Sequence, residues 1–233
     1  MAKPLTATDA ASLVALLTIA SAALPVGAFV YSDGLEMAVS SGDVHDEATL
    51  FAWLEDALEA GNGAVEAAIV ARVHAACEAG RPEDVARWDL ELTALRDADE
   101  MRAQSRAMGA ALIRLLRAQP ADAAAVEAWL PPREPHYPTV AGCTLAAFGI
   151  ERSAAVIGYL HAWATHLIVA GSKLIPLGQS SAHRALRNLA GPIARCAARA
   201  CDLADDGIFE QCAWGASLAS MQHEVLYTRL FKS

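Results

Sequence analysis

Apolar residues recur at steps of three and four through long stretches of this 233-residue chain. The spacing is clearest between Arg81 and Arg117, where Arg102 and Arg106 fall off the apolar positions. Such spacing places one apolar stripe along a helix and leaves the other face to polar groups. It predicts two amphipathic helices, carried by Val85, Trp88, Leu92 and Leu95, and by Met101, Ser105, Met108, Leu112 and Leu115.

Start and stop signals divide the rest of the chain into further helices. Asp9 and Asp46 are candidate N-caps, and Pro82 opens the first amphipathic helix. Leu24-Pro-Val-Gly-Ala-Phe29 and Gly61-Asn-Gly63 predict turns, because proline and glycine interrupt helices. The other helices are expected near residues 9–22, 32–39, 46–60, 64–78, 140–148, 153–171, 179–204 with an interruption at 191–192, and 208–227.

Composition also favours helices. Ala, Leu, Arg and Glu are abundant, whereas β-branched and aromatic residues are sparse. With 55% hydrophobic residues, the chain is long enough to bury a core. We expect an all-α fold, a single-domain orthogonal bundle of about ten helices over residues 1–233. Residues 1–10 are a candidate disordered segment, and residues 119–138, with five prolines, are a candidate loop region around a short helix.

Charge is negative overall and unevenly distributed. A net charge of −9 and a pI near 5.2 argue against a general nucleic-acid binder, because phosphate contacts need clustered Lys and Arg. Residues 33–100 carry 17 acids and four basic residues, whereas residues 152–201 carry six basic residues and no acid. Two interpretations stay open: the basic stretch steers the molecule toward an acidic partner, or the charges only solvate two helical faces.

Two uncharged runs, residues 10–32 and 153–172, are long enough to span a bilayer. Pro25 and Gly27 interrupt the first, while His161 and His166 dilute the second. Both therefore suit buried helices better than membrane spans. A signal peptide is the competing interpretation of the first run, since Lys3 precedes an apolar segment, but Asp9 weakens it.

Five cysteines occur without repeated spacing, and the number is odd. This usage fits reduced thiols in a cytosolic protein better than a disulfide framework. We therefore expect a cytoplasmic location.

No signature of catalysis or metal binding is present in the sequence. There is no phosphate loop, no Gly-x-Gly-x-x-Gly, no nucleophile elbow and no Cys-x-x-Cys or His-Glu-x-x-His. His223 and Glu224 are adjacent, so on a helix they point about 100° apart and make a poor acid/base pair. Glu224 is a better candidate for a partner contact or tail anchor. We predict no catalytic, cofactor-binding or metal-binding residues, and no enzyme activity.

The last eight residues combine apolar, aromatic and basic side chains. Leu226, Tyr227, Leu230 and Phe231 are interleaved with Arg229 and Lys232. Because chain ends normally fray, this composition indicates docking onto another surface. The residues leave open whether that surface is the chain's own core or a partner.

Short motifs in a fixed order resemble those of the UreF urease accessory proteins. None is diagnostic alone, but together they extend from about Leu13 to Ser233. They are Leu24-Pro-Val-Gly-Ala-Phe29, Tyr31-Ser-x-Gly-Leu-Glu36, Met108-Gly109, Lys173-x-x-Pro-Leu-Gly-Gln179, Ala219-Ser-Met-x-His-Glu224 and Tyr227-x-Arg-Leu-Phe231. The chain departs from the family pattern at Gln222, Val225, Leu226, Thr228 and Lys232.

The resemblance implies an all-helical homodimer that assembles with UreD (also called UreH), the GTPase UreG and the urease apoprotein during nickel insertion. It implies a chaperone-like scaffold that modulates UreG and holds no cofactor. By position, the residues resembling the UreD-binding tail are Tyr227, Arg229, Leu230, Phe231 and Lys232. Lys173 and Gln179 resemble a face linked to UreG, and Tyr31 and Glu36 belong to a further candidate surface. A small helical metallochaperone that binds nickel through His and Cys is the alternative.

Overall fold

The computed structural model describes residues 7–203 and 214–233, and these residues form helices and connecting turns without a strand. The predicted all-α class is confirmed. The elements are α1 Ala7–Ile19, η1 Ala28–Val30, α2 Leu35–Ser40, α3 Glu47–Ala60, α4 Asn62–Glu78, α5 Pro82–Leu95, α6 Asp99–Arg117, α7 Pro120–Glu127, α8 Tyr137–Ala147, α9 Arg152–Leu174, α10 Gln179–Asn188, α11 Ala190–Asp202 and α12 Trp214–His223.

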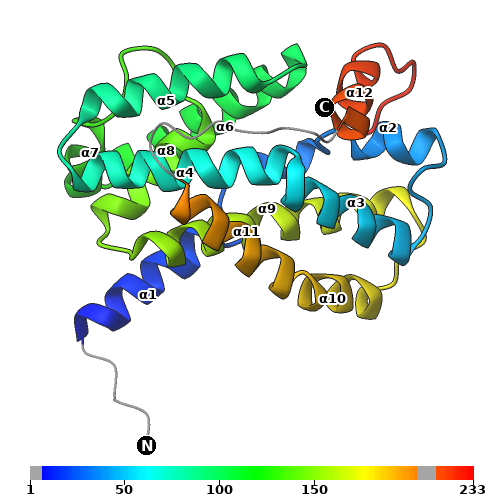
Figure 1. Ribbon diagram of the computed structural model, residues 1–233, viewed down its shortest axis with the longest axis horizontal. Coiled ribbons are helices and arrows are strands. Elements are labelled where there is room, and N and C mark those ends of the chain that lie inside the picture. The colour runs from blue at the N-terminus through cyan, green and yellow to red at the C-terminus, as the bar shows by residue number, and fades with distance from the viewer. Residues whose placement is uncertain (1–6, 204–213) are drawn as a thin grey trace, which may run out of the picture.

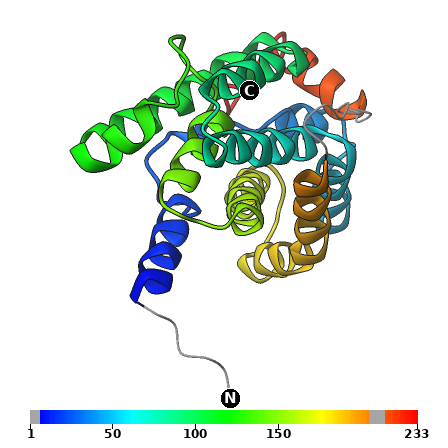
Figure 2. The same cartoon turned by 60° about the vertical axis from the view of Figure 1, so that its left-hand side comes forward.

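The central element is α4, which packs against α3, α5, α8, α9 and α11. Figure 1 shows it crossing the middle of the molecule, and Figure 2 shows the other helices arranged around it. Alanines and β-branched residues make α4 apolar on all sides, so that it is buried almost from end to end. In both views α1 projects from one side of the bundle, and its main packing partner is α9.

Several predicted helix boundaries are confirmed by their local chemistry. The Asp46 side chain accepts a hydrogen bond of 2.8 Å from the Thr49 backbone N–H. The Thr49 side chain accepts one from the Asp46 backbone N–H, which completes a capping box at the start of α3. Pro82 occupies the first turn of α5, where the missing N–H is not needed. In contrast, α1 begins at Ala7, before Asp9 and within the segment 1–10.

The helix expected at residues 32–39 begins instead at Leu35. Asp33 and Gly34 have φ angles of 52° and 81°, in the left-handed region, so neither continues a right-handed helix. Ser220 of α12 lies against Gly34, and a Cβ at this glycine would meet the serine hydroxyl at 2.8 Å. The turn therefore serves two purposes, since it redirects the chain and admits α12 at close range.

Two boundaries near the end of the chain also differ from expectation. The break expected at residues 191–192 lies at Leu189, because Pro192 is accommodated within the first turn of α11. The last helix ends at His223 and not near Tyr227, because the Val225 and Leu226 amides form turn bonds to the Gln222 and His223 carbonyls in place of helical ones. Residues 208–213 of that predicted helix lie outside the described part of the chain.

The basic stretch of α10 and α11 faces acidic residues of α3. Arg184 forms an ion pair with Glu47 at 2.7 Å, and Arg195 forms one with Glu55 at 3.2 Å. These exposed pairs contribute little stability individually. They do show that part of the uneven charge distribution is neutralised inside one chain.

Within the described residues, α9 is the one helix whose length and apolar composition would allow a membrane span. Of its most apolar window, 61% is buried inside the protein. It is therefore a core helix, as its interruption by polar residues predicts. The described cysteines Cys77, Cys143, Cys196 and Cys201 are unpaired thiols, and Cys212 lies outside the described residues.

Close packing against backbone accounts for the glycine of the Met108-Gly109 motif in α6. A Cβ at this position would lie 2.3 Å from the Pro135 carbonyl oxygen, which belongs to backbone and cannot rotate away. We expect Gly109→Ala to lower the free energy of unfolding by about 1–3 kcal/mol in urea denaturation. Gly215→Ala is the matched control, because nothing lies within 4 Å of a Cβ there. A neutral Gly109→Ala would contradict the close packing.

Candidate partner-binding site

The last eight residues, here named the tail (residues 226–233), return to the start of α2. The Lys232 backbone N–H donates to the Val30 carbonyl at 2.8 Å, and the Ser32 N–H donates to the Ser233 carbonyl at 2.7 Å. Figure 1 shows this end of the chain beside α2 and α12. The tail is thus fixed by backbone pairing with a segment two hundred residues earlier.

The Glu36 carboxylate is the main acceptor for the tail. Oε1 accepts the Leu230 N–H at 2.6 Å, and Oε2 accepts the Phe231 N–H at 2.9 Å and faces His223 Nε2 at 3.0 Å. Burial raises the pKa of this carboxyl, but the bonds from His223 and the two amides outweigh burial and hold the pKa below the usual value for a glutamate. Its contribution to stability is therefore present above the pKa of a glutamate in the unfolded chain and is lost as the pH falls through the lowered pKa.

His223 lies between two carboxylates from different helices. Its side chain is fully buried, with Nε2 toward Glu36 of α2 and Nδ1 2.8 Å from Glu100 Oε2 of α6. Glu100 also forms an ion pair with Arg229 of the tail. Glu224 accepts the Glu100 backbone N–H at 3.2 Å, which makes it an anchor between α12 and α6. The two carboxylates approach opposite sides of the ring, so they do not converge on a common metal position.

Phe231 fixes the tail through apolar contact. It is 5% exposed and belongs to the main hydrophobic cluster. The Lys173 ammonium lies 5.4 Å from the centre of its ring, within the range of a cation–π interaction. Beyond it, the Ser233 hydroxyl donates to the Gln104 side-chain oxygen, and Gln104 donates to Asp33 at 2.6 Å.

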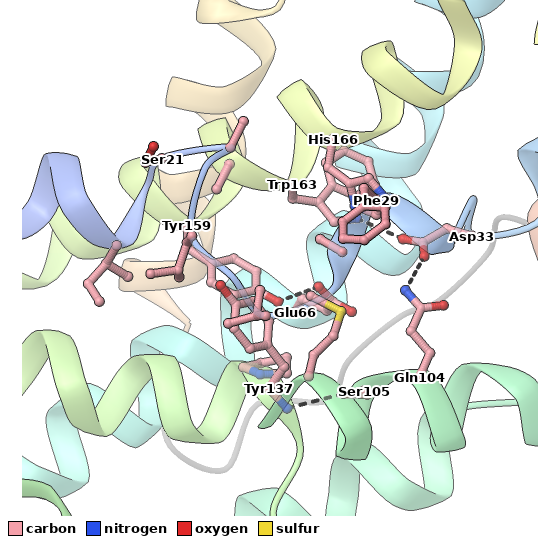
Figure 3. Close-up of a pocket in the computed structure, with 18 of the residues that line it drawn as sticks. Ser21, Phe29, Asp33, Glu66, Gln104, Ser105, Tyr137, Tyr159, Trp163 and His166 are labelled. Carbon is pink, nitrogen blue, oxygen red and sulfur yellow. Dashed lines mark hydrogen bonds between the residues drawn. The ribbon is translucent and has the colours of Figure 1, made fainter. Parts of the chain in front are cut away.

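Asp33 connects the tail to a partly open cavity of about 90 Å³. Its second carboxylate oxygen accepts the Trp163 ring N–H at 3.1 Å, as Figure 3 shows. Deeper in the cavity, Tyr159 donates to Glu66 at 2.6 Å, and Arg96 pairs with the same carboxylate. Burial raises the pKa of Glu66 and that of the Tyr159 hydroxyl, so the tyrosine remains a hydrogen-bond donor.

The cavity groups are mainly engaged with one another. Its polar atoms form pairs and triads between helices, and no cluster of three or more His, Cys, Asp or Glu side chains suited to a metal occurs in the parts of the chain that the structure describes. No described nucleophile is paired with an activating base there. The arrangement is suited to fixing the positions of helices and tail.

The structure separates the predicted site residues into exposed and buried groups. Tyr227 is fully exposed and Leu230 is 64% exposed, and the Lys232 side chain also faces solvent. Phe231 of the tail and Glu36 of α2 are both buried, and the Phe231 amide donates to the Glu36 carboxylate. Four of the predicted site residues line one surface hollow: Tyr31, Arg229, Phe231 and Lys232. Gln179 is exposed at the first residue of α10, a helix whose neighbours are α3, α9 and α11.

Sequence reasoning missed the residues that hold the tail. Glu100 and Gln104 carry no local signal, because their partners lie far away in the chain. Ser32 belongs to the Tyr31-Ser-x-Gly-Leu-Glu36 motif, but the motif does not indicate its bond to Ser233. Glu36 and His223 each fall in a motif quoted above, but nothing in the spacing predicts that they meet. The sequence left self-docking and partner docking open, and the structure shows the tail on its own chain with Tyr227 and Leu230 still turned outward.

The buried position of Phe231 predicts how the tail is released. Phe231→Ala removes most of its buried apolar surface, so we expect faster hydrogen exchange at the Lys232 amide while the far-ultraviolet circular dichroism of the helices is retained. Leu230→Ala is the control, because this side chain is largely exposed. Loss of helicity in Phe231→Ala would show that the tail is part of the global core.

Comparisons with known proteins agree with the motifs. The UreF family model matches residues 44–190. The urease accessory protein UreF of Nostoc sp. is 42% identical over 219 residues, which cover 94% of each chain. The protein of the same name from Thermosynechococcus vestitus is 42% identical over 227 residues, covering 97% of this chain and 99% of that one, and that from Dechloromonas aromatica is 39% identical over 223 residues, covering 95% and 97%. The chain belongs to the UreF family of urease accessory proteins.

Proposed function

We propose that this chain is a non-enzymatic scaffold for urease maturation in the cytoplasm. It bridges UreD (UreH) and the GTPase UreG and modulates GTP-linked nickel insertion into the urease apoprotein. Family membership supports the role in maturation, and the observation that carries the scaffold function is the tail. Its backbone is fixed by hydrogen bonds to the buried Glu36 carboxylate, whereas the Tyr227 and Leu230 side chains point to solvent.

Exposed apolar side chains are concentrated in two regions. Among the described residues, thirteen large hydrophobic side chains are exposed, and six belong to α12 and the segment that follows it. These six, named the outer strip, are Trp214, Leu218, Met221, Val225, Tyr227 and Leu230. Aromatic and aliphatic side chains of this kind form the energetic centre of protein interfaces. The outer strip is the proposed UreD-binding surface.

The rigid backbone beneath this strip favours binding. A flexible tail would lose conformational freedom on binding, whereas one already held by Glu36 loses less. Arg229 adds a cation at the edge of the strip, paired with Glu100 and 37% exposed at its side chain. Lys173 and Gln179 are the proposed contacts to UreG. Because Lys173 lies over Phe231, the two proposed partner surfaces adjoin.

Binding to UreD should depend on the outward side chains of the tail. We expect the double variant Tyr227→Ala and Leu230→Ala to weaken binding by about 2 kcal/mol or more in titration calorimetry, with unchanged thermal stability. Leu90→Ala is the matched control, since Leu90 is 60% exposed but lies on α5. Equal affinity of the double variant and the wild type would refute the assignment.

The second exposed region supports the proposed homodimer. The two uncharged runs of the sequence pack together as α1, η1 and α9, and they expose Leu13, Val14, Leu17, Phe29, Ile157 and Val169. Each copy carries a net charge of −9, so most approaches between two copies bring like charges together. Residues 10–32 and 153–172 carry no charge and avoid this repulsion. We name this surface the charge-free face and assign it to a second copy.

A charge placed on this face should separate the copies. We expect Leu17→Asp to shift the chain from dimer to monomer in size-exclusion chromatography with light scattering. Leu17 is 61% exposed, and the aspartate introduced in each copy would face the apolar surface of the other copy. Leu90→Asp introduces the same charge elsewhere and should leave the dimer intact. A dimeric Leu17→Asp variant would place the dimer contact on another face.

A further inference from the structure

The environment of His223 fixes its protonation state. Its side chain is fully buried, and both ring nitrogens face carboxylate oxygens, at 2.8 Å from Glu100 and 3.0 Å from Glu36. A neutral imidazole has one N–H and one lone pair, so it satisfies only one of these acceptors. The imidazolium form donates to both. The geometry therefore calls for a doubly protonated ring.

The proton does not belong to either carboxyl. Glu36 already accepts two backbone N–H groups, and its pKa lies below the usual value. Glu100 forms an ion pair with the Arg229 guanidinium. With His223 protonated, the charges of these four groups sum to zero. Loss of the proton leaves a net negative charge, and Glu224, which contacts the Glu100 backbone, adds a further one nearby.

The same ring joins the three elements that hold the tail. It is the last residue of α12, it bonds to α2 through Glu36, and it bonds to α6 through Glu100. Glu36 in turn accepts the Leu230 and Phe231 amides, and Glu100 holds Arg229. Any change that weakens the His223 bonds therefore acts on both anchors of the tail at once. Lys173 of α9 is a further cation near the tail, and its ammonium lies over the Phe231 ring.

We propose that His223 is a positioning residue that works as a protonated latch, holding the tail in its partner-binding position when charged and releasing it when neutral. A neutral ring keeps one hydrogen bond and presents a lone pair to the other carboxylate, which separates α12 and the tail from α2 or from α6. The latch describes how the tail of the proposed scaffold is held, and it rests on the proposed function only for the identity of the partner. Tail docking should therefore weaken when the His223 ring loses one of its two N–H donors.

Nuclear magnetic resonance on the full-length protein tests the latch without any partner. Ring ¹⁵N shifts report whether one or both nitrogens of His223 carry a proton, and His223→Gln assigns the signal among the seven histidines. Hydrogen-exchange protection factors of the Leu230 and Phe231 amides report docking, corrected for the intrinsic effect of pH. We expect protection to fall roughly tenfold to hundredfold with the same midpoint as the ring titration. A neutral His223 in the docked state, or protection unaffected by its titration, would overturn the proposal.

Two variants separate the latch from a simple structural role. His223→Gln should reduce protection of both amides at every pH and remove the step that follows the ring titration, whereas His183→Gln, at an exposed position of α10, should leave both unchanged. In Glu100→Gln, a neutral imidazole can donate to Glu36 and accept from the new amide. That variant should therefore keep the tail docked at the pH where the wild type releases it. A Glu100→Gln protein that still releases its tail there would contradict the latch.

Binding of UreD is measured separately, at a pH below and a pH above the His223 titration. Weaker binding above the titration in the wild type, but not in Glu100→Gln, supports both the latch and the proposed partner. Tail release without any change in UreD affinity would retain the latch and refute the tail as the UreD contact. Loss of affinity without tail release would refute the latch and leave the proposed function standing.

Discussion

The Glu36 carboxylate accepts two tail amides and faces the ring of His223, and this set of hydrogen bonds determines where the end of the chain lies. A buried carboxylate is stable only when donors surround it, because its desolvation is unfavourable. Here the donors come from α12 and the tail, so burying Glu36 requires both to be in place. The left-handed turn at Asp33 and Gly34 sets the position of α2 and admits α12 at Ser220. Local backbone geometry and long-range hydrogen bonding thus support each other.

This arrangement explains how one short segment combines stability with recognition. Phe231 and the backbone face inward, where burial and hydrogen bonds fix them. Tyr227 and Leu230 face outward, where they add to the exposed side chains of α12. The proposed scaffold function depends on this division, because apolar side chains bind best when their backbone is already ordered. The charge-free face of α1, η1 and α9 is a second exposed apolar region, and its lack of charge suits contact between identical acidic chains.

The sequence predicted the elements well wherever the signal was local. The Asp46 cap, Pro82 and the apolar spacing of α5 and α6 each act within one or two turns of helix, and the structure has helices at those places. The prediction was wrong where tertiary contact overrides local preference. Residues 224–227 were expected to continue the last helix, but the chain turns after His223, and the Leu230 and Lys232 amides further on bond to Glu36 and Val30. The start of α2 shifted because Asp33 adopts a left-handed conformation, stabilised by bonds to Gln104 and Trp163.

The sequence by itself determined the all-α class, most helix positions and, through ordered motifs, membership of the UreF family. It also placed the residues of the candidate site in separate motifs without relating them. Only the tertiary structure decided that Glu36, Glu100, His223 and Arg229 form one charge-balanced group, because their pairing depends on contacts across more than one hundred residues. It likewise decided which tail side chains are buried. Helix formation is governed by near neighbours, whereas the packing of a tail is governed by the surface that the whole fold presents to it.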